Sequence, residues 1–118
     1  MARYMLLIFG DAQQWAAMTD EEAVAHDAAH NAFHAAAGSR LIGGGALQPA
    51  PVATTLRSDG MDGFIITDGP FLETKEAVGG YYQLEASDLD EVIKLASMLP
   101  EVHAGHSAVE IRPAVDHG

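Results

Sequence analysis

Alternating stretches of apolar and polar residues predict a mixed α+β chain. Short apolar runs that end at glycine, aspartate or proline are typical of strands, whereas apolar residues repeating every three or four positions predict helices. The first helix is expected over 20–37, and the second between Ser87 and Pro100. The expected strands cover 3–10, 41–47, 54–57, 64–67, 81–85 and 108–112.

Both helices carry start and stop signals. Thr19 with Glu22 forms a capping-box signature before the first helix, and Gly38 is a plausible stop. Ser87 is expected to cap the second helix, and Pro100 to end it. The apolar face of the second helix is formed by Leu89, Val92, Ile93, Ala96 and Leu99.

The order of elements predicts the fold class. Strand, helix, strand, hairpin, helix and strand favour an α+β protein, and the simplest arrangement is a ferredoxin-like sheet with both helices on one face. The other face of the sheet then needs cover. We expect a second copy to supply it, sheet to sheet, in a homodimer. The alternative is a monomer whose outer sheet face is polar.

Composition and charge exclude several classes of partner. The 118 residues suit one domain, and 6 Lys and Arg against 17 Asp and Glu give a net charge of −11. This balance argues against nucleic acid and against an anionic membrane surface as partners. The chain has no cysteine, and no stretch approaches the roughly 18 apolar residues of a membrane span. Without a recognisable signal peptide, we expect a cytoplasmic protein.

The first helix holds the clearest candidate chemistry. His26, His30 and His34 are spaced i, i+4, i+8, so they sweep about 80° of the helix surface and form one stripe. An imidazole there can act as general acid or base. The alternatives are half-buried histidines without a role, or a metal site. A third ligand would come from Asp68, Glu73, Glu76, His103 or His106. We expect no cofactor and no resident metal.

The segment 67–76 is the second candidate region. Asp68 begins an Asp-Gly-Pro sequence, which is strong turn chemistry, and Lys75 and Glu76 follow in a polar connection. Such a connection is either a simple turn or a binding loop. Tyr81 and Tyr82 point to opposite faces of a strand, so one is expected to offer its hydroxyl to a pocket. Trp15, in the loop before the first helix, is interpreted as a packing lid.

These motifs together resemble the YCII-related family, in its DGPF subgroup. The run Asp-Gly-Pro-Phe-x-Glu-x-Lys-Glu at 68–76 is the most specific, and the similarity covers almost the whole chain. The other matching stretches are 4–8, 44–49, 79–82, 87–91 and 109–113. The resemblance implies a dimeric α/β barrel of ferredoxin-like protomers.

The resemblance also implies candidate activities. A few relatives are dehydrochlorinases of chlorinated hydroxyquinols, and others are encoded beside extracytoplasmic-function sigma factors. The proposed acid–base pair of the wider family is a histidine on the first helix with an aspartate before a proline after the second. His30 matches the histidine better than His26, but Leu99 stands before Pro100. We therefore expect Asp68 to replace that aspartate.

We expect a small-molecule-binding protein, with proton transfer on an aromatic or lactone-like substrate, as in a lyase or isomerase, as its candidate activity. His30 and Asp68 are the expected catalytic residues. The expected substrate-binding residues are His26, Lys75, Glu76 and Tyr81. The alternative is a non-catalytic ligand-sensing or regulatory protein that partners a sigma factor.

Overall fold

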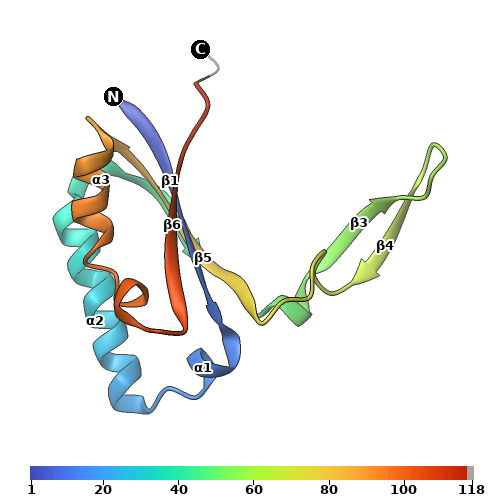
Figure 1. Ribbon diagram of the computed structural model, residues 1–118, viewed down its shortest axis with the longest axis horizontal. Helices are drawn as coiled ribbons and strands as arrows, with labels where there is room; N and C mark the ends of the chain where they lie inside the picture. The colour runs from blue at the N-terminus through green and yellow to red at the C-terminus, as the bar shows by residue number, and fades with distance from the viewer. Residues whose placement is uncertain (117–118) are drawn as a thin grey trace.

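The computed structural model describes residues 1–116 and shows a four-stranded sheet with two helices on one face (Figure 1). Three 3-10 turns join the elements: η1 (Gly38–Arg40), η2 (Ala50–Val52) and η3 (Pro100–His103). The strands and helices are β1 (Ala2–Asp11), α1 (Ala12–Ala16), α2 (Asp20–Ala37), β2 (Leu41–Ala46), β3 (Thr54–Ser58), β4 (Phe64–Asp68), β5 (Glu76–Ala86), α3 (Leu89–Ala96) and β6 (Ser107–Pro113).

The main sheet has the strand order β2-β5-β1-β6, and each neighbouring pair is antiparallel. The first strand of the chain is therefore central, between β5 and the last strand. This mixed architecture confirms the predicted α+β class and is consistent with a ferredoxin-like fold. The sheet-to-sheet dimer stays a prediction.

Alternation along the strands builds the core between the sheet and the helices. On β1, Leu6 and Ile8 point toward the helices, whereas Leu7 and Phe9 point the other way and remain half-buried. The helices contribute apolar side chains that close this layer. The buried cluster contains Tyr4, Leu6, Ile8, Phe33, Ala37, Tyr82, Leu84, Ala86, Val92, Ala96 and Leu99.

The predicted N-cap of α2 is confirmed, whereas the predicted N-cap of α3 is wrong by one residue. The capping box of α2 is present in full, because the Thr19 hydroxyl accepts from the Glu22 amide and the Glu22 carboxylate accepts from the Thr19 amide, both at 3.1 Å. The N-cap of α3 is Asp88 rather than Ser87, since its carboxylate lies 2.9 Å from the Glu91 amide, three residues on.

Among the described residues, no helix has the length and apolar character needed to cross a bilayer.

The hairpin of β3 and β4 forms a separate two-stranded sheet, which projects from the body of the protein (Figure 1). We call this hairpin the arm. Its cross-strand register places Leu56 opposite Ile66, with Phe64 on the same face, and these side chains are 60%, 63% and 62% exposed. The opposite face carries Thr67 and Ile65. A two-stranded hairpin is marginally stable alone, and the apolar face of the arm is exposed to solvent.

Candidate functional site

The histidine stripe of α2 faces the interior side of β5 and the turn η3. The one-turn spacing sets the imidazole rings of His26 and His30 side by side, with their centroids 4.7 Å apart. His34 is one turn further and lies against the ring of Tyr82, with centroids 5.3 Å apart. The structure thus brings all three histidines to one site.

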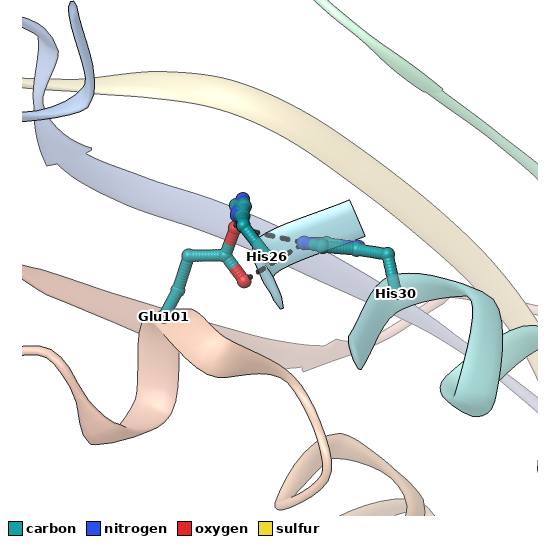
Figure 2. A group of neighbouring side chains, drawn as sticks. All are labelled: His26, His30 and Glu101. Carbon is teal, nitrogen blue, oxygen red and sulfur yellow. Dashed lines mark hydrogen bonds and ion pairs between the residues drawn. The ribbon is translucent and has the colours of Figure 1, made fainter. Parts of the chain in front are cut away.

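A buried carboxylate holds two of these histidines together. Glu101 is only 5% exposed, and its Oε2 lies 2.9 Å from Nε2 of His30 and 3.1 Å from Nε2 of His26 (Figure 2). Burial raises the pKa of Glu101, but the hydrogen bond from His30 and the nearby imidazoles outweigh burial and lower its pKa below the ordinary value. Glu101 is therefore an ionised hydrogen-bond acceptor at neutral pH.

A tyrosine extends this pair into a chain. The Tyr82 hydroxyl lies 2.7 Å from Nδ1 of His30 and 3.1 Å from Nε2 of His34. Because ionised Glu101 only accepts, Nε2 of His30 donates to it, and Nδ1 of neutral His30 then accepts from the Tyr82 hydroxyl. His34 in turn donates to the Tyr82 oxygen. Burial, followed by the negative charge of Glu101, raises the pKa of Tyr82, so its phenol stays protonated.

These residues border a cavity of about 500 Å³ beneath α2. Its wall is mostly apolar and aromatic with a few convergent polar groups, as is typical of small-molecule sites. A second hollow of about 320 Å³ adjoins it and shares Trp15, Met18, His26 and Glu101. The first cavity is lined by Ile8, Trp15, Met18, His26, Asp27, His30, His34, Gly44, Gly45, Ala46, Gly79, Gly80, Tyr81, Tyr82 and Glu101.

Trp15 is part of both walls and lies in the short helix α1, not in a loop as expected from the sequence. Asp11 caps this helix by accepting from the Gln13 amide. The indole packs directly on the backbone of Gly79, where an added Cβ would come within 2.3 Å of the ring. Its Nε1 donates to the Ser107 hydroxyl at 3.1 Å. Glycine is therefore needed at position 79 because of this close approach.

The change Gly79→Ala is expected to displace Trp15 from the sheet. The new methyl group overlaps the indole, and overpacking of this kind costs about 1–3 kcal/mol. Trp15 is the only tryptophan, so its emission reports the change directly, and we expect a shift to longer wavelength as the ring meets water. Gly105→Ala is the matched control, because an added Cβ there meets nothing within 4 Å. Unchanged emission in the first variant would contradict the packing described.

The other residues expected from the sequence lie elsewhere in the structure. Asp68 ends β4 on the arm, and Glu76 is exposed at the start of β5. The Lys75 Nζ lies 3.7 Å from Oδ2 of Asp11, with which it forms an ion pair. Of the described residues, none of these three belongs to the cavity wall. Their expected roles stay predictions.

Tyr81 belongs to the cavity wall, but alternation along β5 directs its side chain to the sheet face that the helices leave uncovered. The hydroxyl beside the histidines is that of Tyr82. A signal for this existed, because Tyr82 has the same strand parity as the apolar Leu84 and Ala86, which lie in the core.

The carboxylate beside His30 is Glu101, which directly follows Pro100. The sequence resemblance implies an aspartate before that proline, where Leu99 stands, and Asp68 was the expected replacement. The proline begins η3, and this turn directs the next side chain back toward α2. The signal in the sequence is a carboxylate directly after Pro100, on the opposite side of the proline from the aspartate of the family.

The fold and the site together define an α+β protein with a histidine–carboxylate cavity. The chain belongs to the YCII-related family, since the family model described as "YCII-related domain" matches residues 2–115. Assignment to the DGPF subgroup stays a prediction.

A curated relative of this chain is the uncharacterized protein R00369 of Rhizobium meliloti (strain 1021). The two chains are 37% identical over 67 residues, which cover 57% of this chain and 53% of the relative. The match thus spans about half the length of that relative, and its name states no activity.

Proposed function

We propose that this protein binds a small organic molecule in the cavity beneath α2 and catalyses a proton transfer on it, as a lyase or isomerase does. The observation that carries this proposal is the buried Glu101 held on Nε2 of His30, whose Nδ1 meets the Tyr82 hydroxyl in the cavity wall. A carboxylate that orients an imidazole, which in turn accepts from a hydroxyl, is an arrangement that enzymes use to move protons.

The geometry supports a relay through Tyr82. The hydroxyl takes a proton from the substrate and passes its own proton to Nδ1 of His30, so the phenol is never left ionised. The imidazolium that forms still donates from Nε2 to Glu101, whose negative charge stabilises it. Return of the proton to another atom of the substrate completes an isomerisation or the loss of a leaving group. The raised pKa of Tyr82 fits a relay better than a free tyrosinate.

The cavity wall favours a small, flat substrate. The indole of Trp15 and the ring of Tyr82 supply aromatic surface, and a volume of about 500 Å³ is at the lower end of ligand cavities. These features support the aromatic or lactone-like class that the sequence suggested. An acidic C–H or O–H beside a carbonyl or hydroxyl group is what the relay needs.

Hydrogen–deuterium exchange tests the proposal without knowledge of the product. Protein treated with EDTA is incubated in D₂O with a panel of hydroxylated aromatics and lactones, and the loss of each C–H signal is followed by NMR. We expect one or more compounds to exchange, and the rate to fall about 100-fold or more in His30→Gln and Tyr82→Phe, as loss of acid–base catalysis implies. His103→Gln is the matched control, because His103 is exposed and outside both cavity walls. Exchange that persists in the first two variants would refute the relay.

We also propose that the protein works as a homodimer. The apolar face of the arm and the half-buried outer face of the sheet, which carries Met5, Leu7 and Phe9, are the surfaces that a second copy would cover. A net charge of −11 favours apolar over ionic contact between identical chains.

The alternative function, a regulatory partner of an extracytoplasmic-function sigma factor, stays a prediction of the sequence resemblance. The same holds for the cytoplasmic location. A pull-down from the host at two salt concentrations tests the partner, because contact with a basic surface would weaken as salt rises.

A further inference from the structure

We propose that His26, His30 and Glu101 form a binding site for a first-row divalent transition metal, with Zn²⁺ as the fitting probe. The ion would take the place of the proton that His30 shares with Glu101. This inference is independent of the proposed enzymatic activity, because it concerns binding alone.

The positions of the ligand atoms carry the proposal. Nε2 of His30 and Nε2 of His26 lie 2.9 Å and 3.1 Å from the same carboxylate oxygen of Glu101, and the ligand atoms of all three residues lie within 4.8 Å of one another. Ligands held about 2.0–2.1 Å from a tetrahedral zinc ion are about 3.3 Å apart. The two histidine–carboxylate distances therefore need to lengthen by only a few tenths of an ångström, and the two imidazole nitrogens, which lie within 4.8 Å of each other, need to approach by about 1.5 Å at most. Figure 2 shows the three side chains directed toward one another.

The donor types select the class of metal. Two imidazole nitrogens and one carboxylate oxygen suit zinc and its neighbours, whereas magnesium and calcium prefer oxygen alone. All three side chains line the 500 Å³ cavity, so a fourth coordination position faces open space. Three protein ligands with one open position are the pattern of accessible zinc sites rather than of closed structural ones.

The hydrogen-bond chain behind His30 fits a metal as well as it fits a proton. When Nε2 of His30 binds an ion, Nδ1 carries the hydrogen and donates to the Tyr82 oxygen at 2.7 Å. The Tyr82 hydroxyl then donates to Nε2 of His34 at 3.1 Å, so every bond in the chain reverses direction and none is lost. Partners of this kind fix the orientation of a metal-bound histidine.

The metal and the proton compete for one atom. An ion on Nε2 of His30 separates the imidazole from the charge of Glu101 and reverses the hydrogen bond to Tyr82, so the metal-loaded protein has no proton acceptor at Nδ1. If the proposed relay exists, zinc inhibits it reversibly. The deuterium-exchange test of the relay uses EDTA-treated protein without metal, whereas the test of the metal site measures zinc binding. Failure of the relay and failure of the metal site therefore give different results.

Equilibrium binding tests the site on tag-free, EDTA-treated protein. A chromogenic zinc chelator competes for the ion, and elemental analysis after desalting gives the stoichiometry. We expect one zinc per chain, and at least about tenfold weaker binding in His26→Ala and Glu101→Gln, since each removes one of three ligands. His103→Gln is the matched control and is expected to bind like the wild type, because His103 is exposed and outside this cluster. His26 is half-buried on a helix, so its variant keeps the fold, which circular dichroism verifies.

A variant that keeps all three ligands sharpens the result. Tyr82→Phe retains the ring in the core but removes the partner of Nδ1 of His30, and we expect zinc affinity to fall about 10–100-fold. A wild type that retains no zinc at micromolar concentration would overturn the proposal. Zinc that remains on both His26→Ala and Glu101→Gln would overturn it equally, because the ion would then lie elsewhere.

Discussion

Protein that carries both Leu56→Asp and Ile66→Asp is expected to be monomeric at concentrations where the wild type is dimeric. These two side chains lie opposite each other on the apolar face of the arm, and each is at least 60% exposed in the protomer. Burial of a Leu or Ile side chain contributes about 1.5–3 kcal/mol. Because each is about 60% exposed, a symmetric dimer that loses four of them loses about 4–7 kcal/mol, so the dissociation constant rises about 10³-fold or more.

Light scattering coupled to size-exclusion chromatography measures the mass of each variant, and sedimentation gives the dissociation constant. Ile65→Asp is the matched control, because Ile65 is on the same strand and half exposed but points to the other face of the arm. We expect this control to remain dimeric. A wild type that is monomeric at every concentration, or a double variant that dimerises like the wild type, would contradict the assembly.

The change Phe33→Ala is expected to lower the free energy of unfolding by about 3–5 kcal/mol. Phe33 is fully buried in the C-terminal half of α2, and its ring packs on Tyr82 with centroids 4.7 Å apart. Truncation leaves a cavity between the helix and the sheet, and it removes the surface that holds Tyr82 against His30 and His34. Urea unfolding followed by circular dichroism measures the loss.

The conservative change Phe33→Leu separates packing from other causes. It keeps most of the volume, so the expected loss is smaller, about 1.5 kcal/mol or less. If Phe33 is tightly packed, the losses of unfolding free energy in the two variants should therefore differ by more than 1 kcal/mol. A loss of unfolding free energy below about 1 kcal/mol for Phe33→Ala would contradict the tight packing around Phe33.

The elements that could be predicted from the sequence are those set by local patterns. The capping box of Thr19 and Glu22 fixed the start of α2 correctly, and helical periodicity identified α3. The helix α1 was missed because five residues are too few to show a period. The start of β5 was missed because the stretch before Tyr81 was interpreted as irregular, whereas in the structure β5 begins at Glu76 and the indole of Trp15 packs on Gly79 within this strand.

The candidate site was predictable only where one element supplies it. The stripe of His26 and His30 follows from the helical repeat alone. Glu101 is separated from His30 by 71 positions, so its contact depends on how η3 returns to α2, which no local pattern encodes. The motif around Asp68 drew attention to a carboxylate that the fold places on the arm instead.

The central place of β1 has a consequence for how this chain folds. Its neighbours in the sheet are β5 and β6, and the latter pairs Tyr4 with Pro113 across nearly the whole chain. A ribosome therefore releases the middle strand of the sheet long before either flanking strand exists. Pairing that joins such distant segments is slow, because a large loop must close first. The apolar residues of β1 are thus exposed in the nascent chain until β5 has been synthesised, and over that interval this strand is a segment that a chaperone would protect.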